Sequence, residues 1–390
     1  MILNPLLSLA LLLFGAKIGG ILLGKLKQPS VIGELVAGIV LGPSLLALVD
    51  PANEFIITIK ELGLLFMILL VSLTIDWKIL EGRAERFSWM ELTRVILVTV
   101  AVYIISVLLG WDIYTTVVMG TVIAIASTAI VARTLTDMKL FNSSEGQTLI
   151  GLEVVDEVVA IVSVAVIANI MEGSEITLWP ILTIIFLVVG LFVVLSRVGF
   201  KFVKRLTSSI QKYGIEDALF AFTLLFAFVL GSLTEGINLA YVLGVFVAGM
   251  LLCRSAQHPI ITRKVKEIGE SFFIPVFFAS VGLSINLFIA SEQLIPILMI
   301  MGIVVGVKLI TAMTAFKLFH YSTADAFKLS SGFVTLSEMT AVIVAVAVAK
   351  LDPVFYVGLI ASFVLINAVS PLLIKFAFGR KTSASRKGWS

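Results

Sequence analysis

The chain has 390 residues, of which 59% are hydrophobic and only 14% are charged, and its mean hydropathy is +1.13. A soluble domain carries about 25% charged residues, so this composition excludes an ordinary soluble protein and indicates one that crosses a membrane several times. The small net charge of +3 gives no reason to expect nucleic-acid binding, and a single cysteine with two histidines leaves no disulfide, zinc or Ser-His triad signature. We therefore expect a protein that is not an enzyme and needs no cofactor.

Apolar runs of about 20 residues, the length that crosses a bilayer as a helix, recur along the whole chain. The first has no basic region before it and no small-residue cleavage site, so we expect a retained helix and not a signal peptide. The predicted fold is an all-α membrane protein with one transmembrane domain over 1–378 and a polar cytoplasmic tail over 379–390. Thirteen transmembrane helices are predicted, at about 5–24, 30–49, 56–76, 88–110, 113–137, 145–171, 176–203, 216–234, 238–256, 268–288, 291–318, 325–349 and 353–378.

The basic residues gather in alternate loops, which predicts the orientation of the chain. By the positive-inside rule these loops are cytoplasmic, which puts the N-terminus outside and the C-terminus in the cytoplasm, as an odd number of helices requires. The loops in question contain Lys25, Lys27, Lys78, Arg83, Arg86, Lys139, Lys201, Lys204, Arg205, Lys212, Arg254, Arg263, Lys264, Lys266, Lys317 and Lys328.

An internal repeat is visible at an offset of about 210 residues. The sequence IGELVAG at 32–38 resembles LGVFVAG at 243–249, and VSLTID at 71–76 resembles VGLSIN at 281–286. Because this offset spans seven helices, matched segments would cross the membrane in opposite directions. That is typical of inverted-topology repeats, which bind their substrate near the membrane midplane. We predict repeat one over about 5–171, a linker helix over about 176–203 and repeat two over about 216–378.

Three acidic residues, Glu153, Asp156 and Glu157, lie close together inside the apolar segment 145–171. Each acidic residue at the centre of a membrane helix costs about 2.5–3.5 kcal/mol on insertion scales. At i and i+3, Glu153 and Asp156 share a face of the helix, and Glu157 borders it. The cluster offers hard oxygen ligands that suit protons or small cations.

Hydroxyl residues lie in the middle of two further apolar segments. Ser127 and Thr128 interrupt 113–137, and the sequence TLSEMT at 335–340 interrupts 325–349, again about 210 residues later. Such side chains can satisfy backbone groups that local unwinding exposes, so we predict that both helices break there and that their ends meet near the acidic cluster. The alternative is that each hydroxyl only bonds to a carbonyl one turn back.

Several basic residues and one further acidic residue also lie inside apolar segments. Lys308 is too deep in 291–318 to reach either membrane surface, so we expect a carboxylate of the acidic cluster as its partner, in a functional or a purely structural pair. Arg94 and Arg133 lie near the cytoplasmic ends of their helices, where extension toward the surface is expected. Glu338 is deep, and we expect it to pair with Arg133 or another base.

These residues and several motifs together resemble the cation:proton antiporter superfamily, in its second bacterial and archaeal branch of sodium/proton and potassium/proton exchangers. The resemblance covers almost the whole chain. The motifs that carry it are QPSVIGELVAGIVLGP at 28–43, ELGLLF at 61–66, PVFFASVGLS at 275–284 and VVDEV at 154–158, the last in the place of the family's paired aspartates.

The resemblance implies a homodimer of thirteen-helix subunits, with a core domain that moves against a dimerisation domain and two crossed discontinuous helices. It implies that Asp156 is the cation and proton carrier and that Lys308 is the lysine that pairs with it in electrogenic members. Ser127 and Thr128 match the polar break of the first crossed helix, and Glu338 matches the glutamate of the second.

Two departures from the family pattern concern the ligands. Glu157 replaces the usual second aspartate, which leaves the preferred ion size open, and Glu153 is an additional carboxylate. The predicted site thus has Asp156 and Glu157 as ligands of a monovalent cation, with Glu153, Glu338 and Arg133 in support.

The resulting interpretation is a secondary active sodium/proton antiporter in a prokaryotic cell membrane, in which proton and cation compete for a midplane carboxylate site. Its partners would be the two ions, the lipid bilayer and a second copy of the chain. Potassium/proton exchange stays open because an Asp-Glu pair does not exclude it. A carrier of organic anions is disfavoured by three central acidic residues, and a passive cation channel would lack stoichiometric proton coupling.

Overall fold

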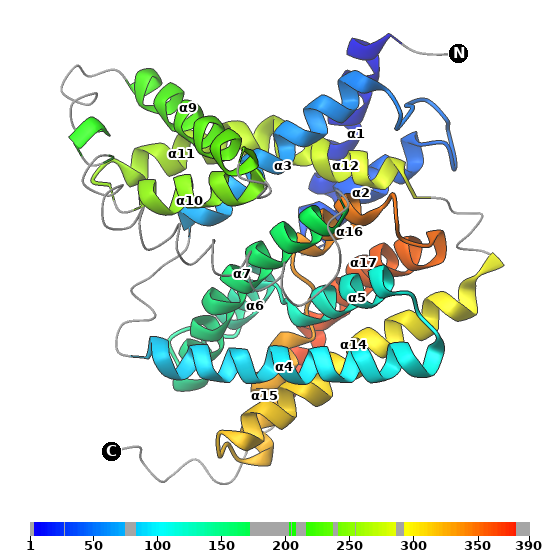
Figure 1. Cartoon of the computed structure of the whole chain (residues 1–390), viewed down its shortest axis with the longest axis vertical. Coiled ribbons are helices and arrows are strands. Elements are labelled where there is room, and N and C mark those ends of the chain that lie inside the picture. The colour runs from blue at the N-terminus through cyan, green and yellow to red at the C-terminus, as the bar shows by residue number, and fades with distance from the viewer. Residues whose placement is uncertain are drawn as a thin grey trace. The chain divides into compact units, whose positions relative to one another are not determined.

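The computed structural model describes residues 4–26, 28–74, 83–171, 203, 205–207, 216–236, 241–253, 255–285 and 292–379. Every regular element in these residues is a helix, as the composition predicts (Figure 1). The chain divides into two compact units, each assembled from separate stretches of sequence.

The first unit draws on Met1–Ile75, Ile161–Glu292 and Ala341–Pro353. Helix α2 packs against α1 and α12, and α10 packs against α9 and α3. The approach of α1 to α2 requires glycine, because a Cβ on Gly33 would lie 2.1 Å from the carbonyl oxygen of Gly19. Its helices are α1 (Pro5–Lys25), α2 (Ser30–Leu41), α3 (Glu54–Thr74), α9 (Glu216–Glu235), α10 (Tyr241–Cys253), α11 (His258–Ile268), the π-helical turn η2 (Gly269–Phe273) and α12 (Ile274–Leu283).

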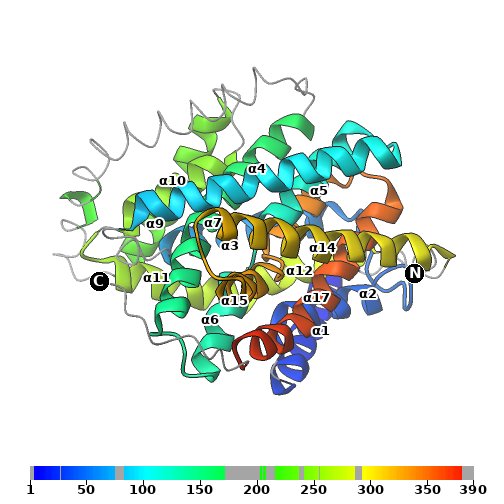
Figure 2. The same ribbon diagram turned by 90° about the horizontal axis from the view of Figure 1, so that it is seen from below.

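The second unit draws on Asp76–Ala160, Gln293–Thr340 and Val354–Ser390, and it contains all the predicted site residues. The long helices α4 and α14 lie side by side (Figures 1 and 2), and α14 also packs against α15. Its helices are α4 (Ala84–Leu109), α5 (Ile113–Ala124), α6 (Thr128–Asp137), α7 (Ser144–Met171), α14 (Leu294–Leu318), α15 (Thr323–Phe333), α16 (Met339–Ala347) and α17 (Pro353–Gly379), with α7 and α16 divided between the units.

Six of the described helices are long and apolar enough to span a membrane, namely α1, α3, α4, α9, α14 and α17. Each predicted segment except 176–203 contains a described helix, whereas residues 172–202 lie outside the described part of the chain. The total of thirteen therefore stays a prediction. The predicted segment 30–49 is too long, because α2 ends at Leu41. Helix α11 was not predicted, because its sequence HPIITRKVKEI is too rich in charge to resemble a membrane span.

Two of the predicted spans are interrupted, and both interruptions fall where the hydroxyl residues predict them. Between α5 and α6 the chain leaves the helical conformation at Ile125, where the backbone is extended, and resumes it at Thr128. Between α15 and α16 it is non-helical from Val334 to Glu338. Each interruption frees backbone amides and carbonyls that need partners in a buried setting.

Candidate ion-binding site

The first interruption is held by a carboxylate from α7. Asp156 accepts a hydrogen bond of 2.5 Å from the backbone amide of Ala126. Ala126 directly precedes Ser127, the N-terminal capping residue of α6. Ser127 then caps α6, because its hydroxyl accepts from the amide of Ile130 at 3.4 Å. Asp156 is only 1% exposed, so its charge acts directly on the broken backbone.

The second interruption is held by an amide from α17. The side chain of Asn367 accepts from the amide of Leu336 and donates to the carbonyl of the same residue, both at 2.8 Å. Asn367 is 2% exposed and satisfies both backbone groups of Leu336 without a charge. The two interruptions thus use the same device, a polar side chain from the long helix that follows.

The two interruptions also contact each other. The amide of Ser127 donates to the hydroxyl of Thr335 at 2.8 Å, and the hydroxyl of Ser127 lies 3.3 Å from a carboxylate oxygen of Glu338. Thr335 in turn donates to the carbonyl of Gly332 at 2.9 Å. The predicted meeting of the helix ends is therefore observed, and the alternative in which the hydroxyls only bond one turn back along intact helices is wrong.

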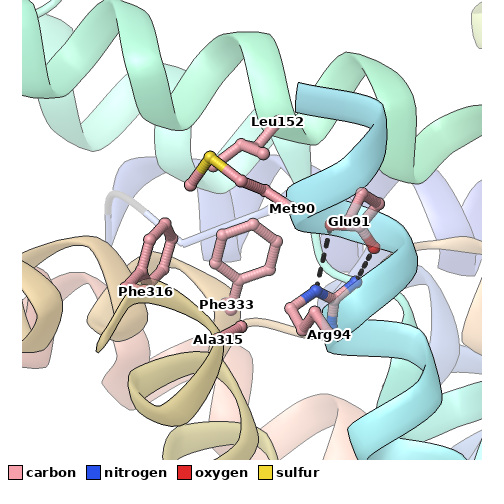
Figure 3. A pocket seen from close by; sticks show the side chains of 7 residues that line it. All are labelled: Met90, Glu91, Arg94, Leu152, Ala315, Phe316 and Phe333. Carbon is pink, nitrogen blue, oxygen red and sulfur yellow. Dashed lines mark hydrogen bonds and ion pairs between the residues drawn. The ribbon is translucent and has the colours of Figure 1, made fainter. Parts of the chain in front are cut away.

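Arg94, and not Lys308, forms the ion pair with Asp156. Its guanidinium lies 2.6 Å from Asp156 and donates to the carbonyl of Ala124. It also pairs with Glu91 on its own helix (Figure 3). The ring of Phe333 covers the guanidinium at 4.5 Å. With 2% exposure Arg94 does not extend to the membrane surface, so that expectation is wrong. Two carboxylates and a helix end compensate for its burial.

Lys308 neutralises a helix end and does not pair with an acid. Its ammonium donates to the carbonyls of Ile123 and Ile125, at 3.0 and 2.5 Å, where α5 ends. No carboxylate in the described residues forms an ion pair with it, so the predicted direct pair with Asp156 is absent. The last carbonyls of a helix lack internal partners and carry the negative end of its dipole, which makes this an energetically suitable place for a fully buried cation.

The remaining predicted residues have distinct surroundings. Glu153 is fully buried, and neither of its carboxylate oxygens has a hydrogen-bond partner in the described structure. Glu157, which is half-buried, interacts with Thr128 and Glu338. Arg133 belongs to α6, but its side chain lies outside the described residues, so its predicted pair with Glu338 is untested.

Three functional positions were missed by sequence reasoning, although each left a signal. Glu91 and Arg94 are an opposite-charge pair at i and i+3 within an apolar helix, the spacing at which side chains meet on one face. Asn367 is 210 residues after Glu157, the offset of the internal repeat, in the helix that follows the second interruption. A search for polar residues at this offset would have found it.

The arrangement combines buried carboxylates, the buried side chains of Arg94 and Lys308, and two interrupted helices that contact each other. Breaks of this kind bring dipole ends and unpaired backbone groups to an ion site inside a membrane protein. The carboxylates can bind a proton or a small cation, and both are positively charged, so the two compete for the same negative charge.

Comparison with known proteins finds relatives that match nearly the whole chain. The chain is 23% identical over 381 residues to the Na(+)/H(+)-K(+) antiporter GerN of Bacillus cereus, with 97% of each chain covered. It is 24% identical over 391 residues to an Na(+)/H(+) antiporter of Enterococcus hirae, covering 97% of this chain and 98% of the relative. The fold is similar to that of the sodium proton antiporter MjNhaP1 from Methanocaldococcus jannaschii, with a TM-score of 0.72, 15% identity and 96% of each chain covered.

A sequence model of the family of transmembrane sodium/hydrogen exchangers matches residues 10–378, which is nearly the entire chain. The match includes both interruptions and every site residue described above. The chain therefore belongs to the sodium/hydrogen exchanger family.

Proposed function

We propose that this protein is a secondary active antiporter that exchanges sodium for protons across a prokaryotic cell membrane. The observation that carries the proposal is the buried carboxylate of Asp156, which lies at a helix break and is already paired with a cation of the protein itself. A transported cation can replace that pairing without new structure, and a proton can neutralise the same site. Membership of the family and the relatives named above support sodium as the cation.

The proposed carrier group is Asp156, assisted by the hydroxyl and backbone oxygens of the breaks at Ser127 and Thr128. The buried hydroxyl of Thr128 lies beside the carboxylate of Glu157, so the two side chains can offer oxygens to the same ion. Glu157 and Glu338 supply further negative charge on the same side as Thr128. Alternating access would then expose the loaded site first to one side of the membrane and then to the other.

The proposed inverted repeats are supported by the helix bounds. Helices α4, α5, α6 and α7 begin at 84, 113, 128 and 144, and α14, α15, α16 and α17 begin at 294, 323, 339 and 353, so each pair is offset by 209–211 residues. The two contacts of the breaks follow the same rule, since Ala126 and Leu336 are the amides held by Asp156 and Asn367. We propose repeat one over 5–171, a linker helix over 176–203 and repeat two over 216–378.

The thirteen-helix topology, the N-terminus outside, the cytoplasmic C-terminus and the homodimer belong to the same proposal. Positive charge in alternate loops supports the orientation. The resemblance to dimeric antiporters supports the dimer. Labelling of single cysteines introduced near residues 4 and 379, in sealed cells with a membrane-impermeant reagent, would test the orientation at both ends of the described chain.

Potassium is the alternative cation, because the relative GerN is named as an Na(+)/H(+)-K(+) antiporter. An organic anion is disfavoured, since the site concentrates buried carboxylates that would repel it. A channel is disfavoured by the buried ion pair at Asp156, because Arg94 already occupies the carboxylate that a passing cation would contact.

The function is tested by flux measurements on the purified protein in proteoliposomes that contain a pH-sensitive dye. Sodium, lithium or potassium added outside acidified vesicles should raise the internal pH, with sodium most effective. Empty liposomes give the background. Cation flux that continues without proton movement would identify a channel and contradict antiport.

Glu157 provides a test of the ligand set. The Glu157→Asp variant should keep exchange with an altered apparent affinity for sodium, because only the reach of the carboxylate changes. Glu157→Gln should lose much more, because an amide has no charge to offer the cation. The measurement is the sodium concentration at half-maximal dye response. If Glu157→Gln matches the wild type, Glu157 is structural and Asp156 works with hydroxyl and backbone oxygens.

A further inference from the structure

Two neighbouring charged groups in the buried cluster have unused hydrogen-bonding capacity. The Nη1 atom of Arg94 is buried and has no acceptor among the described residues, and both carboxylate oxygens of Glu153 are buried without a donor. The two side chains lie within electrostatic range of each other. Both are nearly or completely excluded from solvent, at 2% and 0% exposure. Unpaired buried groups of opposite charge are costly and are rarely kept without a use.

Arg94 would have to move only a short distance to exchange Asp156 for Glu153 as its partner. Glu153 and Asp156 are at i and i+3 on α7, so they occupy one face and are about 4.5 Å apart along the helix axis. Arg94 remains tethered by Glu91, which lies one turn away on α4. A small pocket beside the guanidinium is bounded by Met90, Glu91, Arg94, Leu152, Ala315, Phe316 and Phe333 (Figure 3). Its wall includes Leu152, so the pocket adjoins the turn of α7 that carries Glu153.

The charge balance of the cluster requires one more positive charge. Its buried ionisable groups are Glu91, Arg94, Glu153, Asp156 and Lys308, three acids and two bases that lie on α4, α7 and α14. Fully ionised, they carry a net charge of −1 in a buried region. Arginine stays protonated in proteins, and Lys308 is fixed on the carbonyls that end α5. The missing charge is therefore a proton on a carboxyl or a bound monovalent cation.

From these observations we propose that Arg94 exchanges between Asp156 and Glu153 and that Glu153 is the seat of the proton that is exchanged for the cation. This proposal rests on the proposed antiport. In the state seen here Arg94 pairs with Asp156, and Glu153, which has no partner, is neutral. When sodium binds Asp156, the guanidinium moves one turn along α7 to Glu153, whose O–H bond breaks and whose proton leaves to the solvent on the open side.

The proposed step balances. One sodium ion enters and one proton leaves, so the five-residue cluster is neutral before and after, and no group other than Glu153 changes its protonation. Because Arg94 can neutralise only one of the two carboxylates at a time besides Glu91, binding of sodium and retention of the proton exclude each other. Coupling follows from this exclusion, with Arg94 acting as a positioning residue that carries the charge between the sites.

The test measures the proton directly on the purified full-length protein in detergent. Sodium added to weakly buffered wild-type protein should release protons, detected with a pH dye, and should remove an infrared band of a protonated carboxyl. In Glu153→Gln both signals should be lost. In Glu153→Asp the band should persist at a shifted frequency, and it should still respond to sodium. Glu145→Gln, the same substitution in the first turn of α7, is the matched control and should behave as the wild type.

The outcomes separate this proposal from the antiport itself. A sodium-sensitive carboxyl band and normal proton release in Glu153→Gln would overturn it, because the proton would then reside on another group such as Asp156. An unshifted band in Glu153→Asp would overturn it too, and this variant keeps the test valid if Glu153→Gln does not fold. If the wild type releases no protons and shows no exchange in proteoliposomes, the antiport proposal fails instead.

Discussion

Replacement of Asp156 by Asn should reduce sodium/proton exchange to the background of empty liposomes while the protein remains folded. An amide can still accept the hydrogen bond from Ala126 through its oxygen, so the first interruption keeps its support. It provides no negative charge for a cation, and its nitrogen would face Arg94, which can only donate. Arg94 keeps its pair with Glu91, which is why we expect the fold to survive.

The measurement is sodium-dependent dye response in proteoliposomes, together with size-exclusion chromatography of the purified variant. Asp217→Asn is the matched control, because Asp217 is 89% exposed and pairs only with Lys264 near the start of α9. Exchange in Asp156→Asn at more than a small fraction of the wild-type rate would remove Asp156 from its assigned role. A misfolded variant would show instead that the charge of Asp156 is needed to compensate for Arg94.

Removal of the Lys308 ammonium should destabilise the non-helical segment between α5 and α6. Exchange would then be lost because the structure of the site is lost. Lys308→Met would leave the carbonyls of Ile123 and Ile125 buried without donors, and each such group costs about 1–3 kcal/mol. The negative end of the α5 dipole would also lose its compensating charge. Lys308→Arg keeps both charge and donors, and we expect it to keep a large part of the stability.

Thermal unfolding in detergent and exchange in proteoliposomes should therefore fall together in Lys308→Met. Lys317→Met is the control, because this lysine is exposed in the last turn of the same helix. Flux measured with and without a potassium–valinomycin potential distinguishes the structural role from proton transport by the lysine. If the wild type responds to the potential and Lys308→Arg loses that response with its stability intact, then Lys308 carries a coupled proton and the role described here is wrong.

The sequence was sufficient to predict both interruptions and the helices that surround them. Ser127 and Thr335 could be placed because hydroxyls can satisfy backbone groups exposed by a break, and because both stretches occur at one offset. The position of the acidic cluster was equally predictable, since three carboxylates in an apolar helix are costly wherever they point. These inferences depend only on residue type and depth.

The choice of partners could not be predicted, because it depends on which of several nearby groups each side chain reaches. Lys308 was assigned to the acidic cluster on the principle that buried charges pair, and to Asp156 by the family resemblance. The open carbonyls at the end of α5 are also negative and accept its hydrogen bonds instead. Arg94 was expected to extend to the membrane surface because it lies near the end of its helix. Its side chain instead points into the second unit, where it pairs with Asp156. The position of a residue along a helix can be read from the sequence, whereas the direction in which its side chain points depends on how the helix packs.

The two side chains that hold the interruptions, Asp156 and Asn367, also have a consequence for the proposed repeats. An amide in a broken helix needs an acceptor, and a neutral side chain provides one without requiring a counter-ion. In the segment that contains Asn367, the side chain that holds the interruption only supports the backbone of Leu336. The other half has an ionisable group at the equivalent place, together with the arginine that balances it. If the proposed repeats are right, each subunit has one backbone-holding side chain that can also bind a cargo ion, which would limit transport to one such ion per cycle.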